Sequence, residues 1–207
     1  MRKLYFLFAF AGLALAHSCT DHEVIPPPVP LVDLNCECEM DVADSVNKVT
    51  YSDSCKYYSD KVISTGDGTS NARYRTFIKD AGVIGGLEIE VRSIDWVDDG
   101  SNNPPLDAWK AFLEDNPTPV YSGGYDHNGV VVRWTDPNGR VWESDSTSTI
   151  CVKDFVFNTM IHESDTTGTY MQFDATFNCS LFNSDYGVID SLKCIENAHV
   201  RSAFKLE

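Results

Sequence analysis

Cysteine is the residue type in this sequence with the widest range of possible chemistry, and the number of cysteines is odd. The seven cysteines are Cys19, Cys36, Cys38, Cys55, Cys151, Cys179 and Cys194. An exported protein normally pairs its thiols, so an odd number leaves one cysteine to explain. If Cys19 carries a lipid, six cysteines remain, which permits three disulfides. The count therefore predicts Cys19 as a lipidation site and the other six as disulfide candidates.

The residues before Cys19 have the pattern of a targeting segment. Arg2 and Lys3 form a short positive stretch, and residues 4–16 are uncharged and mostly apolar. This apolar stretch is too short to cross a bilayer as a helix, but it matches the central region of a signal peptide. Residues 1–18 are thus predicted to be a lipoprotein signal peptide. The alternative is cleavage after Ala16, which would leave all seven cysteines in the exported chain.

One disulfide can be argued from the strand pattern. Cys179 lies on the apolar face of an expected strand at 169–181, and Cys194 follows a turn-forming stretch at 185–187. A hairpin around that turn would bring the two cysteines opposite each other, so we expect Cys179 to be bonded to Cys194. The alternative is that both are buried free thiols, which behave as small hydrophobic residues.

The partners of the other four candidates stay open. Cys36 and Cys38 in "NCECE" are too close together to pair with each other, so each is expected to reach elsewhere, to Cys55 and Cys151. Connectivity cannot be deduced from spacing. A zinc site is the alternative, but the usual C-x-x-C spacing is absent, and no metal site is predicted.

Paired carboxylates are a second candidate for chemistry. Glu88 and Glu90 in "EIEVR" lie on the same face of an expected strand. The stretch resembles the E-I-D-x-x-E pattern of a family of β-jelly-roll glycosidases, in which two carboxyls about 5 Å apart act together. Here the middle Asp is replaced by Glu and the last Glu is missing. Alternating glutamates on a solvated strand face explain the pattern better, so no catalytic residue is predicted.

The remaining polar groups give no catalytic or metal motif. The sequence has no G-x-S-x-G motif, and His127, His162 and His199 are scattered along it. The oxygen-rich stretches 98–103 and 125–129 lack the spacing of a calcium loop. No cofactor is therefore expected.

Aromatic side chains are the best sequence indication of a binding surface. Six of them cluster in the middle third of the chain: Trp96, Trp109, Tyr121, Tyr125, Trp134 and Trp142. Trp109 lies on the apolar stripe of an expected helix, and Trp134 shares its strand face with valines, so both are assigned to the core. Trp142 and Tyr125 are predicted to contact a ligand, because exposed rings beside Asp and Asn can stack on sugars or peptides.

The elements that would position these residues have the two-residue period of β-strands from about residue 40 onward. Apolar and polar residues alternate in "TYMQFDATFNCSL" (169–181) and "GLEIEVRSI" (86–94). "GVVVRWTDPNGRVWESD" (129–145) predicts a hairpin around its Pro-Asn-Gly turn. "NNPPLDAWKAFLEDNP" (102–117) predicts a helix. The expected fold is mostly β: an antiparallel β-sandwich, immunoglobulin-like or jelly-roll-like, with one short α-helix.

Composition completes the domain plan and excludes one class of partner. Residues 19–39 are predicted to be a lipidated, Pro-rich tether, and residues 40–207 a single β-sandwich domain. The net charge is −15, or −17 once the two positive charges of Arg2 and Lys3 are removed. Such a negative chain repels phosphate backbones, so nucleic-acid binding is not expected.

Three stretches together resemble small outer-membrane lipoproteins of the Bacteroidetes, which have a β-sandwich after a lipidated cysteine. "SCTDHE" resembles their cleavage site, which in that group can direct export to the cell surface. The hairpin at 129–145 resembles their G-V-x-x-x-Y-T-D-x-N-G-x-x-Y/W-x-S-D motif. "GTYMQFDATFNCSLFNSDYGVIDSLKCIENAHVRSAFKLE" (168–207) resembles their C-terminal ending. The sequence departs from the group at Ala16, where Leu is usual, and at Ala198, where Gly is preferred.

The resemblance implies location and fold, and it brings no catalytic residues. We therefore expect a protein of the outer membrane, held by its N-terminal lipid, with display at the cell surface as an option. The expected function is a non-enzymatic binding or structural module with a glycan or protein ligand. The first alternative is a carbohydrate-binding accessory lipoprotein of a sugar-uptake system, and the second is a glycoside hydrolase-like enzyme.

Overall fold

The computed structural model describes most of the chain after the predicted signal segment. The described residues are 30–43, 48–63, 68–97, 100–122, 128–183 and 192–207. Cys19 and Tyr125 lie outside them, so the predictions made for these two residues are not addressed by the structure. Among the described residues, no helix is long and apolar enough to span a membrane.

The described chain forms a ten-stranded antiparallel sheet and one helix. The strands are β1 (Glu37–Val42), β2 (Val49–Tyr51), β3 (Ser54–Val62), β4 (Thr69–Lys79), β5 (Gly86–Val97), β6 (Gly129–Thr135), β7 (Val141–Ser144), β8 (Asp154–Asp165), β9 (Gly168–Phe182) and β10 (Leu192–Lys205), and the helix is α2 (Leu106–Glu114). Their order in the sheet is β2-β1-β10-β9-β7-β6-β5-β4-β3, and β8 pairs with β9 beside this path.

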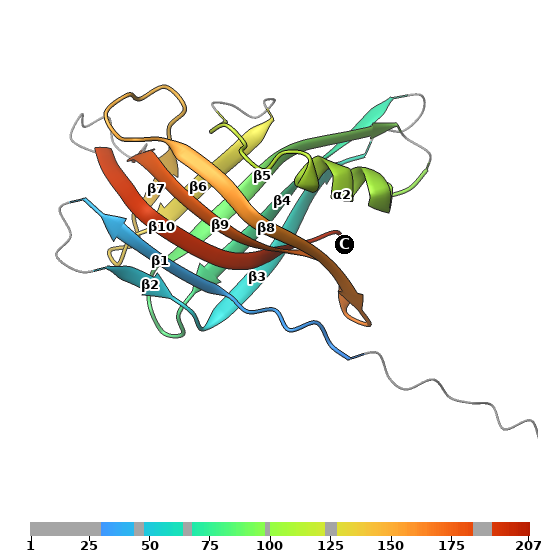
Figure 1. The fold of residues 1–207 in the computed structure, drawn as a ribbon, viewed down its shortest axis with the longest axis horizontal. Coiled ribbons are helices and arrows are strands. Elements are labelled where there is room, and N and C mark those ends of the chain that lie inside the picture. The colour runs from blue at the N-terminus through green and yellow to red at the C-terminus, as the bar shows by residue number, and fades with distance from the viewer. Residues whose placement is uncertain (1–29, 44–47, 64–67, 98–99, 123–127, 184–191) are drawn as a thin grey trace, which may run out of the picture. The chain divides into compact units, whose positions relative to one another are not determined.

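The sheet bends back on itself and makes two layers. In Figure 1, β8, β9, β10 and β1 cross in front of β3, β4 and β5. The layers touch where β10 packs against β3 and β4. The predicted antiparallel β-sandwich with one short helix is confirmed. The two layers belong to one continuous hydrogen-bonded sheet, so they are not separate sheets as in an immunoglobulin domain.

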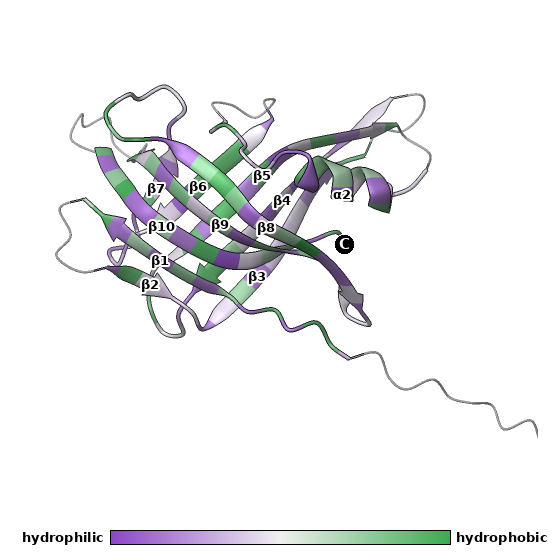
Figure 2. Ribbon diagram, in the orientation of Figure 1, coloured by the Kyte–Doolittle hydropathy of each residue, from purple (hydrophilic) through white to green (hydrophobic). Residues whose placement is uncertain are grey.

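Alternation along the strands places the core between the layers. In β9 the predicted inward residues are all buried: Met171, Phe173, Ala175, Phe177, Cys179 and Leu181. The hydropathy colours of Figure 2 alternate along β9 and β10 accordingly. Phe173 stacks on Phe204 with ring centroids 4.8 Å apart, and Phe157 meets Phe173 edge to face. Complete burial of one such aromatic side chain contributes about 1.5–3 kcal/mol.

Helix α2 packs against β5 and β8. Trp109 and Leu113, one turn apart, are buried as the apolar stripe predicts. The ring of Trp109 meets Tyr74 of β4 edge to face at 5.8 Å. Trp109 is therefore a core residue, as expected.

The folded part starts earlier than the expected boundary at residue 40. The compact unit comprises Leu31–Glu207, and β1 already begins at Glu37. The Val32 N–H donates to the Asp165 carboxylate in the β8–β9 turn at 2.7 Å. Residues 31–39 thus belong to the domain, because hydrogen bonds and a disulfide hold them there.

Candidate functional site

Two disulfides form within the described residues. They join Cys36 to Cys55 and Cys151 to Cys194, with Cα atoms 5.9 and 5.7 Å apart. The first is one of the pairings left open by the sequence. The predicted Cys179–Cys194 bond is wrong because the β9–β10 register differs from the expected one by a single residue. Cys194 stands opposite Ser180, and Cys179 stands opposite Ile195, so the two cysteines point to opposite faces of the sheet.

Cys38 and Cys179 are free thiols in the core, so the expected third disulfide does not exist. Cys38 is 2% exposed and Cys179 is fully buried. Burial raises the pKa of each thiol to about 12, and nearby Glu39 contributes to the rise for Cys38. Both thiols therefore stay protonated at neutral pH and act as small hydrophobic residues. Neither can serve as a nucleophile.

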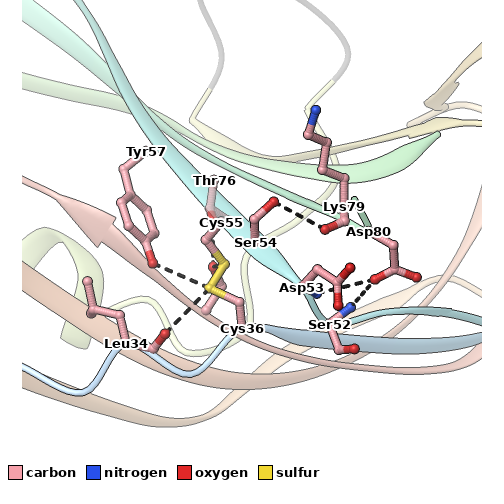
Figure 3. The surroundings of a disulfide bond; sticks show 11 residues. Leu34, Cys36, Ser52, Asp53, Ser54, Cys55, Tyr57, Thr76, Lys79 and Asp80 are labelled. Atoms are coloured by element: carbon pink, nitrogen blue, oxygen red, sulfur yellow. Dashed lines mark hydrogen bonds between the residues drawn. A yellow bond between two sulfur atoms is a disulfide. The ribbon is translucent and has the colours of Figure 1, made fainter. Parts of the chain in front are cut away.

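The Cys36–Cys55 disulfide links the two layers of the sandwich (Figure 3). Cys36 immediately precedes β1 in the front layer, and Cys55 lies in β3 of the rear layer. The Tyr57 hydroxyl donates to the Cys36 sulfur at 3.4 Å, since a disulfide sulfur has no proton to give. The ring of Tyr57 meets Tyr170 of β9 edge to face at 5.9 Å. These contacts make a rigid wall where the two ends of the sheet meet.

An open groove of about 980 Å³ runs beside this disulfide. Its walls come from the segment 34–37, the turn and strand start at 52–57, and strands β8, β9 and β10. This volume is at the upper end of that of ordinary ligand pockets, about 300–1,000 Å³. The residues that line the groove carry charged, amide, hydroxyl and aromatic groups.

Three of the four charged groups of the groove, Glu37, Asp174 and Arg201, are ion-paired within the protein, and Asp53 accepts from the backbone N–H of Ala81. Asp174 accepts hydrogen bonds from Asn158 Nδ2 at 3.0 Å, His199 Nε2 at 2.9 Å and Arg201 Nε at 2.9 Å. Arg201 Nη1 also lies 2.9 Å from Glu37. Burial alone would raise the pKa of Asp174, but these donors outweigh it and lower that pKa to about 2. Asp174 is thus a fixed anion and cannot act as a general acid at neutral pH.

Several lining groups are uncharged hydrogen-bonding side chains. Asn35 and Thr159 are exposed, and Gln172 donates to Glu163 through its amide nitrogen while its oxygen has room for another donor. Ile161 adds an exposed apolar surface on β8. Such a set can hold a polar ligand by hydrogen bonds and one apolar contact.

The glutamates considered for catalysis form a different kind of cluster on β5. Arg133 donates to Glu88 at 2.6 Å, to Glu90 at 2.9 Å and to Glu143 at 2.6 Å, and Arg92 contacts Glu90 from its own strand. Glu90 is 3% exposed and Arg92 is 4% exposed. Burial would raise the pKa of Glu90, but the hydrogen bonds and charges of Arg133 and Arg92 lower it below its ordinary value.

This cluster does not have the electrostatics of a glycosidase pair. A retaining glycosidase needs one carboxyl with a raised pKa, whereas the pKa of Glu90 is lowered. The expectation of a solvated face also needs correction for Glu90 and Arg92, which are buried. Ion pairing with arginines, together with the burial of Glu90, makes Glu88 and Glu90 structural groups.

Trp142 is not a surface ligand contact, and that prediction is wrong. It is 4% exposed, its ring stacks on Trp134 at 6.4 Å, and its Nε1 donates to Asp136 at 3.2 Å. Lys193 Nζ lies 5.0 Å from the centre of the ring. Trp142 and Trp134 stand directly opposite each other in the β6–β7 hairpin, so they share a face and are buried together. Trp134 is a core residue, as predicted.

The described residues offer no metal centre, because no group of three or more His, Cys, Asp or Glu is placed to hold an ion. The groove was not found from the sequence, since its walls come from segments more than a hundred residues apart. Only the disulfide candidacy of Cys36 and Cys55 pointed to this region. Comparison of the chain with models of protein families, with curated proteins and with solved structures found no match.

Proposed function

We propose that this chain is an exported, lipid-anchored, non-enzymatic binding module whose ligand site is the groove beside the Cys36–Cys55 disulfide. The observation that carries the proposal is this open groove, in which Arg201 is bonded to Glu37 and Asp174 and the lining still offers uncharged hydrogen-bonding groups. The lining supports binding, and the lowered pKa of Asp174 does not suit a general acid at neutral pH.

The chemistry of the lining favours an uncharged, hydroxyl-rich ligand, which means a glycan. Glu37, Asp53 and Asp174 bring three negative charges to the groove against one positive charge from Arg201, so the sum is −2 with histidine neutral. That balance repels phosphates and carboxylates. Amide and hydroxyl side chains such as Asn35 and Thr159 suit the hydroxyl groups of a sugar, which donate and accept hydrogen bonds equally well.

The cysteine inventory supports the location. Two disulfides are typical of an oxidising compartment outside the cytoplasm. The odd number of cysteines does not by itself single out Cys19, because Cys38 and Cys179 are also unpaired. Those two thiols are buried in the core, whereas Cys19 follows an apolar segment and precedes prolines. Cys19 remains the proposed anchor, at the outer membrane and with surface display as an option.

Thiol counting tests the anchor. Seven cysteines less four in disulfides leave three thiols, so an unlipidated chain in denaturant without reductant reacts at Cys19, Cys38 and Cys179. A chain lipidated at Cys19 shows two. Incorporation of labelled palmitate and its loss in Cys19→Ala give the second measurement. Three reactive thiols in chain purified from its own membranes, with no palmitate label, would reject the anchor.

A glycan panel tests the ligand site. The full chain should retain at least one neutral glycan, and the double variant Asn35→Ala, Thr159→Ala should lose most of that binding. Asn102→Ala is the matched control, because Asn102 is exposed and does not line the groove. Silence of the wild-type chain across neutral glycans would reject the glycan ligand, and equal loss in the control would reject the groove as its site.

A further inference from the structure

Among the described residues, the second half of strand β8 has one backbone edge without a partner strand. The strand pairs with β9 on one side. On its other side, the start of the strand is engaged, since Phe157 N–H donates to the Pro117 carbonyl at 2.8 Å and helix α2 packs nearby. From residue 158 to Asp165, the described chain supplies no backbone partner on that side. Every second residue there directs its N–H and C=O groups away from β9, as in any antiparallel pair.

This edge lacks the lysines and the short length that protect the ends of the sheet, although β8 carries a bulge at 157–159 and the acidic residues Glu163 and Asp165. At one end, β3 carries Lys56 and Lys61, and Lys61 Nζ donates to the Leu206 carbonyl at 3.1 Å. The Cys36–Cys55 disulfide also ties the preceding segment to β3. At the other end, β2 has only three residues. Lysine, proline and shortness are common means of preventing strand addition, and residues 158–165 contain no Lys, Arg or Pro.

We propose that a second copy of this chain adds to this edge, β8 against β8 and antiparallel, with Ile161 opposite Ile161 of the other copy. Antiparallel pairing of identical strands is two-fold symmetric, so the contact closes as a dimer. Ile161 is 56% exposed in the single chain, and the pairing brings the two isoleucine side chains together. We choose a second copy of β8 as the partner because the side chains of this edge are complementary to themselves when two copies pair antiparallel.

The sequence of β8 is self-complementary in this register. Thr159 meets Glu163 of the other copy, Met160 meets His162, and Asn158 meets Ser164, so no like charges are opposed. The two copies of Glu163 are four residues apart along the pair, about 14 Å, which exceeds the screening length of about 8 Å at physiological salt. A register moved to centre on His162 would oppose the two imidazoles and set Ile161 against Glu163. The isoleucine-centred register avoids both.

The dimer would also extend the groove. Ile161 and Thr159 line it at the β8 side, where the wall of one copy ends. A second β8 continues that wall, so the grooves of the two copies become neighbours on one face. The pairing itself does not depend on the proposed ligand.

Sedimentation equilibrium of the full-length chain tests the proposal. The wild type should form dimers below about 100 µM, and Ile161→Lys should weaken association at least about tenfold, because two lysines would be opposed. Val152→Lys is the matched control, since Val152 is 69% exposed in the loop before β8 and should leave association unchanged. Thermal melts of both variants establish that they are folded.

Two measurements locate the contact. In a Cys19→Ala background, Ile161→Cys should cross-link to itself under mild oxidation, because directly opposed residues have Cα separations that suit a disulfide. Val152→Cys should not. Amides of residues 158–165 should exchange more slowly in the wild-type dimer than in Ile161→Lys. A wild-type monomer at about 100 µM, or a dimer indifferent to Ile161→Lys, would overturn the proposal.

Discussion

Arg133 is the centre of the ion cluster on the outer face of the rear layer, and Arg133→Met tests whether that cluster stabilises the fold. The guanidinium binds Glu88, Glu90 and Glu143, each within 2.9 Å. Methionine keeps part of the aliphatic stem and removes the charge and all three hydrogen bonds. The change therefore isolates the electrostatic contribution better than truncation to alanine would.

The expected loss of unfolding free energy in Arg133→Met depends on how exposed each carboxylate partner of Arg133 is. Glu143 is half exposed, so its pair with Arg133 contributes at most about 1 kcal/mol. Glu90 is nearly fully buried, and removal of one partner of a buried pair costs about 3–5 kcal/mol. Glu90 keeps Arg92, and Arg75 Nε lies 3.9 Å away, which places the expected loss at the lower end, about 3 kcal/mol. For a chain of this size, that lowers Tm by about 6–12 °C.

The pH dependence has a definite sign. The pKa of Glu90 is lowered in the fold, so its ion pairs stabilise the protein above the unfolded pKa, about 4.3. That stability is lost as the pH falls through the lowered folded pKa. The difference in the free energy of unfolding between wild type and Arg133→Met should therefore be largest near pH 7 and shrink below about pH 4.

Urea unfolding followed by fluorescence of the four tryptophans measures this difference at pH 7 and at about pH 3, below the unfolded pKa of a glutamate. Arg140→Met is the control, because Arg140 is an exposed arginine in the β6–β7 turn. It should cost less than about 0.5 kcal/mol. If Arg133→Met costs less than about 1 kcal/mol at pH 7, or if its cost is the same at about pH 3, the buried ion pairs do not stabilise the fold as argued.

Three further predictions follow from the core and the disulfides. Trp142→Ala should destabilise the fold by about 3–5 kcal/mol in urea unfolding and leave glycan binding of the folded fraction unchanged; loss of binding without loss of stability would restore Trp142 as a ligand contact. Loop-closure entropy predicts losses of about 4 kcal/mol for Cys151→Ala and about 3 kcal/mol for Cys36→Ala, so unfolding in which Cys36→Ala is clearly the worse variant contradicts that ranking. Cys38 and Cys179 should not react with a thiol reagent at pH 8 in the native chain, because burial holds their pKa at about 12; fast labelling of either would show that the core opens.

Local pattern was sufficient for the fold class and for most of the core. Strict alternation along 169–181 identified the inward face of β9, and a helical stripe identified Trp109 and Leu113. These features depend only on the two-residue period of a strand and the 3.6-residue period of a helix. These periods do not depend on what the strand or helix packs against, so they can be recognised from the sequence alone.

Register and exposure could not be obtained in the same way. A displacement of one residue between β9 and β10 moved Cys194 to the face opposite Cys179 and changed its partner to Cys151. Trp142 was predicted to be exposed because rings beside Asp and Asn can stack on a ligand. It alternates with the exposed Val141 and Glu143 and stands opposite Trp134, so it points into the core. Glu90 and Arg92 lie on an outer face of the sheet but are buried there by neighbouring side chains, which the periodicity of the sequence cannot indicate.

The ion pairs also limit how much positive charge the domain can offer to a binding partner. Six arginines lie after residue 18, and four of them, Arg75, Arg92, Arg133 and Arg201, contact carboxylates within the fold. A guanidinium already bonded to a buried carboxylate cannot leave it for an external anion without uncovering that carboxylate, which costs several kcal/mol. The positive charge available to a partner is therefore smaller than the composition suggests. In the groove, Arg201 is bonded to Asp174 and Glu37, and the sum of the lining charges is negative, so we expect the proposed ligand to be recognised by hydrogen bonds rather than by its own negative charge.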